Sequence, residues 1–422
     1  MHPATSSTRR TINSPAKFCG VRIHQVRESI GKPNSSNMKL TGLASLVLPL
    51  LLSPLTTANP LPKSKPSTIT TYSETVIFDP PSNYTIPRTL YARTLELPSG
   101  VLLSTWENYS GDTDGLVYFP IYRSTDHGAT WKEISRVEDT HNKIGLRYQP
   151  FLYYLDQKLG GYPAGTILLA GNSIPEDLST TELDLYASRD NGVTWEFVSE
   201  IAKGGEALPD NGLTPVWEPF LLVHKGKLIC YYSDQRDNAT YGQKLVHQTT
   251  TDLKNWGPVV DDVAYPTYTD RPGMPILAQL PNKAYIYIYE YGSYFNTSTY
   301  SFPLYFRIAS DPEQIAAAEG QRLVVSDGTQ PTSSPYVVWT PYGGKHGTII
   351  ASSGTQSSIF VNQNLGQGEW TEIATPESTS YTRDLRVLSE DNGRYLLIAG
   401  GGVLNGADNQ VTASLVDLST VL

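Results

Sequence analysis

Short apolar runs recur along the chain in pairs, and a turn containing Gly, Pro or Asn separates the two runs of each pair. Runs of this length, bounded by turn residues, predict strands that pair as hairpins. The pairs occur six times, roughly 50–65 residues apart, which is the length of a four-stranded propeller blade with variable loops. The first runs occupy residues 92–97, 149–155, 217–223, 274–280, 334–340 and 383–388. The second runs occupy residues 98–106, 163–173, 224–234, 281–292, 342–354 and 391–402.

This pattern predicts an all-β fold, a six-bladed propeller of four-stranded antiparallel blades over residues 72–422. The last apolar segment, 411–422, is expected to close the ring by pairing with Thr75–Phe78. A β-sandwich or two smaller β domains are the alternatives, but the repeat runs without an interior linker and argues against both. Residues 312–320 form the one short helix candidate.

A turn motif supports the propeller. Residues 124–131 and 188–195 both read S-x-D-x-G-x-T-W. Residues 250–256 carry a weaker copy, and residues 309–311 and 362–370 retain only parts of the motif. The Asp accepts hydrogen bonds from turn amides, the Gly permits a positive φ, and the Trp covers the turn. The motif resembles the Asp box of sialidase-like propellers. We interpret it as a structural fastener away from any central site.

The N-terminal segment reads as processing signals. From Met38 one Lys precedes an apolar run and then small residues, which is the layout of a secretory signal peptide and too short a run to span a membrane. We therefore divide the chain into a non-native upstream extension (1–37), a signal peptide (38–58), a Pro/Ser-rich lead (59–71) and the catalytic propeller (72–422). This layout predicts a secreted, extracellular protein. Four N-glycosylation sequons, at Asn83, Asn108, Asn238 and Asn296, fit that location.

Charge and residue usage narrow the function. Residues 59–422 carry 25 Lys and Arg against 40 Asp and Glu, a net charge of −15, so nucleic acid is not an expected partner, and no membrane partner is expected. Cys230 is alone in an apolar strand, and the histidines are scattered singly. No nucleophile elbow, P-loop or metal-ligand spacing occurs, so we expect no cofactor and no metal. We expect a monomer that binds a polysaccharide or oligosaccharide.

Propeller geometry predicts where the chemistry lies. The start of each innermost strand and the end of the second strand meet at one face, where loops line a central pocket. The residues at these positions are charged, amidic and aromatic, as sugar recognition requires. The predicted substrate-binding residues are Arg93, Trp106, Tyr148, Gln149, Trp217, Asp234, Arg271, Tyr291, Ser353 and Arg383.

Two glutamates at this face are the candidate catalytic pair. Glu218 begins one innermost strand, and Glu290 ends the almost wholly apolar strand of the next blade, between Tyr289 and Tyr291. Desolvation should raise the pKa of Glu290, which suits a general acid. Paired carboxylates across a glycosidic bond are the usual hydrolytic arrangement. The competing interpretation is that each glutamate forms a salt bridge with a neighbouring Arg.

Together, the Asp boxes and the glutamates in WEP and EYG resemble the fungal exo-1,5-α-L-arabinanases of glycoside hydrolase family 93, over residues 72–422. The resemblance implies a six-bladed retaining enzyme that releases arabinobiose from the non-reducing ends of linear α-1,5-L-arabinan. It assigns the family's two catalytic glutamates to Glu218 and Glu290, which are 72 residues apart as in that family. We assign Glu218 as the nucleophile and Glu290 as the acid/base, because Glu290 has the more apolar setting.

Two other functions stay open at this stage. A sialidase would use Arg93, Arg271 and Arg383 as a clamp for the carboxylate of sialic acid, with Tyr381 as nucleophile. Residues 86–93, however, read IPRTLYAR and lack the F/Y-R-I-P motif expected there. A non-catalytic sugar-binding propeller would keep the aromatic side chains and tolerate loss of either glutamate.

Overall fold

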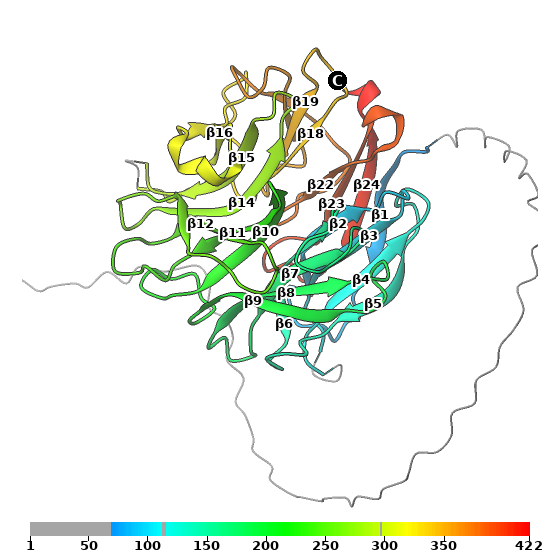
Figure 1. Cartoon of the computed structure of the whole chain (residues 1–422). Helices are drawn as coiled ribbons and strands as arrows, with labels where there is room; N and C mark the ends of the chain where they lie inside the picture. Colours follow the sequence, from blue (N-terminus) through cyan, green and yellow to red (C-terminus); the bar gives the residue numbers. More distant parts are fainter. Residues whose placement is uncertain (1–68, 112–114, 296–297) are drawn as a thin grey trace, which may run out of the picture. The chain divides into compact units, whose positions relative to one another are not determined.

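A computed structural model describes residues 69–111, 115–295 and 298–422. It contains six four-stranded antiparallel sheets, and five of them are built from four strands that are consecutive in the chain. The innermost strands contact one another in the closed order β2, β6, β10, β14, β18, β22 and back to β2. The six sheets are therefore the blades of a propeller (Figure 1), as the repeat predicted.

The blades are numbered here from the innermost strand that comes first in the chain. Blade 1 comprises β2 (Thr89–Glu96), β3 (Leu102–Asn108), β4 (Phe119–Ser124) and β5 (Lys132–Val137). Blade 2 comprises β6 (Leu146–Tyr154), β7 (Ile167–Ser173), β8 (Thr181–Ser188) and β9 (Glu196–Gly204). Blade 3 comprises β10 (Val216–His224), β11 (Lys227–Asp234), β12 (Lys244–Thr250) and β13 (Val260–Val263).

The other three blades follow the same plan. Blade 4 comprises β14 (Arg271–Gln279), β15 (Tyr285–Gly292), β16 (Leu304–Ala309) and β17 (Gln321–Arg322). Blade 5 comprises β18 (Tyr336–Thr340), β19 (Thr348–Ser352), β20 (Ile359–Asn362) and β21 (Thr371–Ile373). Blade 6 comprises β22 (Asp384–Val387), β23 (Tyr395–Gly400), β24 (Val411–Asp417) and, as its fourth strand, β1 (Tyr72–Phe78).

The N-terminal strand closes the ring. β1 pairs antiparallel with β24, so Val76 lies opposite Thr412 and Phe78 opposite Val411, and Figure 1 draws the two strands side by side. This pairing confirms the predicted closure and leaves blade 6 with no missing strand. The apolar faces of neighbouring blades pack together, and the largest buried cluster runs from blade 2 to blade 6. The short helix candidate is the 3₁₀ helix η2 (Pro312–Ala317). None of the helices in the described ranges is long and apolar enough to cross a membrane.

The Asp-box turns have the predicted chemistry. In the second copy, Asp190 Oδ1 accepts hydrogen bonds from the Val193 and Thr194 amides at 3.1 and 2.9 Å, and Ser188 Oγ accepts from the Gly192 amide at 2.8 Å. Gly192 has a φ of 85°, a backbone conformation that would be strained in a residue with a side chain. Ser188 lies opposite Ile167, the first residue of β7, while Glu182 lies opposite Ser173 at the other end of β7. The motif therefore fastens the outer strands at the face away from the predicted site.

Candidate active site

The starts of the innermost strands share a bulge that shapes the site. In blades 1 to 4, the pairing between the innermost strand and the second strand shifts register near the start of the innermost strand. One residue at each shift has a left-handed backbone: Tyr91, Gln149, Glu218 and Met274 have φ values of 54°, 60°, 62° and 59°. A bulge re-aims a side chain relative to the strand alternation. Here it directs side chains and amides toward the centre of the ring.

Glu218 is held at the bulge of β10. Its side chain is buried, and Oε2 accepts hydrogen bonds from the Ser233 hydroxyl at 2.6 Å and from the Met274 amide at 2.7 Å. Its other oxygen, Oε1, takes no hydrogen bond from the residues that the structure describes. Burial raises the pKa of Glu218, while the two donors and the charges of Arg271 and Arg93 oppose the rise. The carboxylate is thus oriented through one oxygen and open at the other.

Glu290 lies near the end of β15 and is partly exposed. Its Oε2 accepts a hydrogen bond from the Ser334 amide at 2.8 Å. Burial, followed by the charge of Glu218, raises the pKa of Glu290 to about 7, and the Ser334 amide and Arg271 only partly oppose this. The predicted rise of its pKa is confirmed in direction. Because Glu218 has more stabilising donors than Glu290, the first ionises more readily and the second keeps its proton to higher pH.

Gly273 brings the two carboxylates together. A Cβ placed on this residue would lie 3.4 Å from Glu290 Oε1 and 3.6 Å from Glu218 Oε2. These two oxygens can therefore be no more than about 7 Å apart, the two distances end to end. The bound excludes a separation of ~10 Å and leaves room for the ~5–5.5 Å between carboxyl groups that retaining glycosidases use. The absence of a side chain at Gly273 is what leaves space between them.

The salt-bridge interpretation of the glutamates does not hold in this structure. Neither Glu218 nor Glu290 takes part in any ion pair between described residues. The nearest candidate, Arg271, instead donates to Gln235 at 2.8 Å and to Gln243 at 2.9 Å. Its positive charge acts on both glutamates without direct contact and partly opposes the rise of their pKa values. Arg271 therefore contributes to the electrostatics of the site without neutralising either carboxylate.

Aromatic side chains predicted for the site do lie at this end of blades 2 and 3. The rings of Tyr148 and Trp217 are 6.5 Å apart, and Tyr109 continues the row 6.1 Å from Tyr148. Trp217 Nε1 donates to Gln235 Oε1, the same oxygen that accepts from Arg271. Gln149, also predicted, connects blade 1 to blade 3 through its amide and side chain. Ring faces of this kind stack on the C–H faces of sugars.

Three predicted binding residues face the wrong side of their strands. Side chains alternate along a strand, so when Glu107, Ser233 and Glu290 face the centre, their neighbours cannot. The misplaced neighbours are Trp106, Asp234 and Tyr291. Trp106 is fully buried and stacks on Phe78 with ring centroids 5.2 Å apart. Tyr291 stacks on Tyr265 at 4.0 Å and donates to Asp270.

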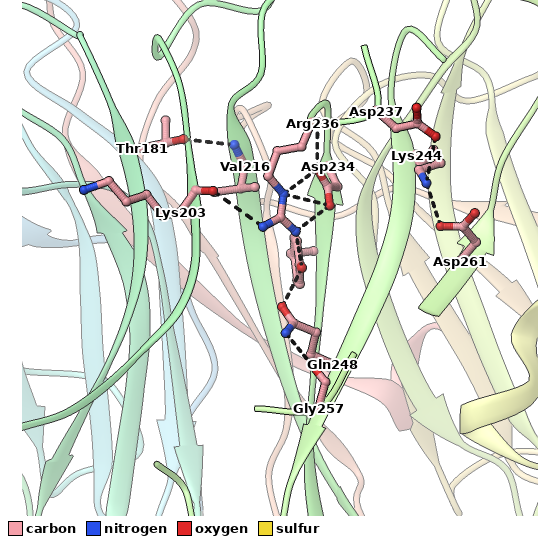
Figure 2. Close-up of polar contacts among 11 residues, drawn as sticks. Thr181, Lys203, Val216, Asp234, Arg236, Asp237, Lys244, Gln248, Gly257 and Asp261 are labelled. Atoms are coloured by element: carbon pink, nitrogen blue, oxygen red, sulfur yellow. Dashed lines mark hydrogen bonds and ion pairs between the residues drawn. The ribbon is translucent and has the colours of Figure 1, made fainter. Parts of the chain in front are cut away.

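Asp234 is bound within blade 3 and is not free for a substrate. Figure 2 shows its carboxylate against Arg236, which donates from Nε at 3.0 Å to Oδ1 and from Nη2 at 2.6 Å to Oδ2. Arg236 also donates to the Tyr232 hydroxyl and to the Lys203 carbonyl. This network ties β11 to β9 of the neighbouring blade. Our assignment of Asp234 to substrate binding was therefore wrong.

Three other predicted binding residues, Arg93, Arg383 and Ser353, are buried, which contradicts the direct contact with substrate that we assigned to them. Arg93 is 1% exposed and its guanidinium stacks on the ring of Tyr91, 4.0 Å from the centroid, so it is covered and does not line the site. Arg383 is fully buried and donates to the carbonyls of Ser357 and Ser358. Ser353 is buried and donates to Gln356. The three arginines of the sialidase hypothesis are held by different groups, which removes the clamp.

The predicted site residues did not include Glu107 and Tyr91, which the fold brings to the centre. Both are buried beside Glu218, while Tyr381, named above for the sialidase hypothesis, has its pKa raised by burial and then by the charges of Glu218 and Glu290. Superposing the repeats would have found Glu107, because Trp106-Glu107 and Tyr289-Glu290 occupy the same place in their hairpins. The bulge amides carry no sequence pattern of their own and could be found only in three dimensions.

One group of side chains has ligand types suited to a metal ion. His224, Asp311 and Glu313 lie close together. Lys225 and Lys227 already form ion pairs with the two carboxylates. His224 lies opposite Lys227 at the end of β10 away from Glu218, so this cluster is remote from the glutamates.

Solved structures resemble this chain closely, although no protein-family model and no curated protein matches it. An α-L-arabinanase from Penicillium chrysogenum, in complex with arabinobiose, is 68% identical, with 84% of this chain and 100% of that chain covered and a TM-score of 0.83. The GH93 α-L-arabinofuranosidase of Fusarium graminearum, also with arabinobiose, is 57% identical, with coverage of 83% and 99% and a TM-score of 0.81. The NanB sialidase of Streptococcus pneumoniae is 10% identical, with coverage of 83% and 71% and a TM-score of 0.55, which is a likeness of fold alone.

Proposed function

Because the chain belongs to glycoside hydrolase family 93, and is therefore a glycoside hydrolase, we propose that it degrades arabinan by releasing arabinobiose from the non-reducing ends of linear α-1,5-L-arabinan with retention of configuration. The observation that carries the proposal is the pair Glu218 and Glu290, presented by adjacent blades on either side of Gly273. Both complexes with arabinobiose belong to proteins that cover this chain over the whole propeller.

Glu290 is the proposed acid/base. With a pKa of about 7 it still holds a proton in mildly acidic solution, and it gives that proton to the glycosidic oxygen as the bond to the anomeric carbon breaks. The Ser334 amide fixes Oε2, so Oε1, which faces Gly273, is the oxygen placed for the transfer. After the leaving group departs, the ionised Glu290 takes a proton from water, which attacks the intermediate.

Glu218 is the proposed nucleophile. The Ser233 hydroxyl and the Met274 amide donate hydrogen bonds to Oε2. Oε1, which accepts no hydrogen bond from the described residues, forms the covalent bond to the anomeric carbon. The covalent glycosyl-enzyme then loses its sugar to water, so that Glu218 returns as a carboxylate and Glu290 regains its proton. Arg271 supports the ionised state of Glu218 from a distance.

Product analysis tests this function directly. The purified protein is incubated with debranched arabinan, and the products are separated by chromatography. Arabinobiose as the sole early product supports the proposal, whereas a ladder of oligosaccharides would point to internal cleavage and would contradict it. A proton NMR time course gives the anomer released first. Inversion of configuration would refute the roles assigned to Glu218 and Glu290.

We further propose that the enzyme is secreted. The support is the layout of residues 38–58, which lie outside the described residues. Expression of the full sequence in a fungal host, followed by N-terminal sequencing of the protein in the medium, tests this. A mature terminus near Asn59 is expected, and an uncleaved protein retained inside the cells would contradict it.

A further inference from the structure

Glu107 occupies in blade 1 the place that Glu290 occupies in blade 4. In the ladders, Leu90 lies opposite Glu107, and Gly273 lies opposite Glu290. In both blades the residue after this pair, Tyr91 or Met274, has the left-handed backbone of the bulge. The innermost strands meet in ring order, so blades 1 and 4 are three positions apart in a ring of six. Glu107 is therefore presented to the same central space from the opposite side.

A chain of hydrogen bonds leads from Glu107 to Glu218. The Gln149 amide donates to Glu107 Oε1 at 3.0 Å, and the Glu218 amide donates to Gln149 Oε1 at 3.0 Å. The Met274 amide then donates to Glu218 Oε2 at 2.7 Å. At each step the amide of a bulge residue binds a side chain that the preceding blade presents. The backbone of Glu218 is thus connected, through Gln149, to the carboxylate of blade 1.

Glu107 is itself fixed on both sides. It is 3% exposed, and its second oxygen, Oε2, accepts a hydrogen bond from the Tyr109 hydroxyl at 2.8 Å. Arg93 is the positive charge that faces it, and Glu218 is the negative one. Burial, above all, raises the pKa of Glu107 to about 7. Such a buried group acts on the reaction only through its neighbours.

The left-handed backbone at Glu218 explains why this support matters. A non-glycine residue in that region is strained and persists only where surrounding contacts hold it. Gln149 is itself left-handed, with a φ of 60°, and depends on Glu107 to bind its amide. If the support is lost, relaxation at Glu218 displaces the carboxylate, and a displacement of about 1 Å can cost 10²-fold in rate.

We propose that Glu107 is a positioning residue for Glu218, acting through the hydrogen bonds of Gln149. Its role is to accept the hydrogen bond from the Gln149 amide and thereby keep two successive bulges in the conformation that aims the Glu218 carboxylate. The kinetic consequence rests on the proposed function, while the structural one does not.

The test compares two variants of Glu107. Glu107→Gln keeps an acceptor for the Gln149 amide and a donor toward the Tyr109 oxygen, so kcat on linear arabinan should stay within about threefold of the wild type. Glu107→Met has a similar length but no acceptor, so kcat should fall about 10–100-fold with KM nearly unchanged. Asp190→Asn, which loosens an Asp-box turn at the other face, is the control for loss of stability and should leave kcat unchanged.

A double-mutant cycle isolates the route. Gln149→Met should lower kcat about as much as Glu107→Met, and the double variant should lose little more, because both changes break the same connection. Additive losses would overturn the connection through Gln149. Equal losses in Glu107→Gln and Glu107→Met would show that charge, and not hydrogen bonding, is what matters, and would overturn the proposal.

Crystal structures of the two Glu107 variants give a readout that needs no substrate. We expect the φ of Glu218 to stay left-handed in Glu107→Gln and to leave that region in Glu107→Met. An unmoved Glu218 in Glu107→Met refutes the positioning role, whichever sugar the enzyme cleaves. A wild type that fails to cleave arabinan refutes the proposed function and leaves this structural comparison decisive for Glu107.

Discussion

Glu290→Gln is expected to separate stability from activity. In the folded protein, burial and the charge of Glu218 raise the pKa of Glu290 from its ordinary 4.5 to about 7. Between these two pH values the folded state binds the proton more tightly than the unfolded chain, so the wild type loses stability as pH rises from 4.5 through 7. Gln carries no charge at any pH, and its amide oxygen can still accept from Ser334. The variant should therefore escape this loss.

The interval between the two pKa values sets the size of the effect. A tenfold change in proton affinity corresponds to about 1.4 kcal/mol, so the free energy of unfolding can differ by at most about 3.5 kcal/mol between variant and wild type above pH 8. Glu290 is partly exposed to the solvent of the pocket, which screens its charge. We therefore expect an advantage of about 1–2 kcal/mol for the variant at pH 8, and none that depends on pH below 4.5.

Urea denaturation at a series of pH values from 4 to 9 measures this difference. The matched control is Asp190→Asn, because the Asp190 carboxylate lies in an Asp-box turn remote from Glu290. The difference in free energy of unfolding between this variant and the wild type should not rise as pH passes through 7. An advantage of Glu290→Gln that is constant across the series, or that is absent at pH 8, would refute the reasoning. The same preparation should turn over linear arabinan about 10²–10⁴-fold more slowly, the usual contribution of a general acid.

Three further outcomes are expected. In the wild type, kcat/KM for linear arabinan should fall as pH rises through about 7, where Glu290 loses its proton, and a rate profile that is flat to pH 9 would contradict the acid role. Asp190→Ala removes the acceptor of the Thr194 amide and hydroxyl and should lower the free energy of unfolding by about 1–2 kcal/mol in urea titrations with kcat unchanged; an unaltered midpoint would mean that the turn is held otherwise. If the protein passes through a secretory pathway, mass spectrometry should find a glycan on the exposed Asn83 and none on the buried Asn108, and a modified Asn108 would show that this part of β3 is open in solution.

The repeat and its chemistry explain why the fold was predictable. Each blade buries apolar side chains between two neighbours, so every hairpin needs the same alternation, and the Asp-box turns need the same Ser, Asp and Gly. These are local requirements, and they stand in the sequence at a regular spacing. Antiparallel pairing alone indicates which ends of the hairpins meet, and the structure places Glu218, Glu290 and Arg271 at that end, as predicted.

The alternation of side chains along the second strands explains three of the errors. Sequence patterns told us which strand ends meet at the pocket, but not which of two adjacent side chains points inward. Neighbouring side chains of β3 point to opposite faces, so Glu107 faces the site and Trp106 packs against Phe78. The same choice set Glu290 inward and Tyr291 outward.

The six blades, the closing strand and the position of Glu218 and Glu290 at one end of neighbouring blades could be predicted from the sequence, because each depends on residues close in the chain or on a repeated pattern. How the glutamates are held depends on the folded ring. The amides of Met274 and Ser334 and the support from Glu107 each come from a different blade from the carboxylate they serve, and Gly273 of blade 4 leaves space between Glu290 of its own blade and Glu218 of blade 3. Hydrogen bonds between blades depend on the closure of the ring, and no local pattern encodes them.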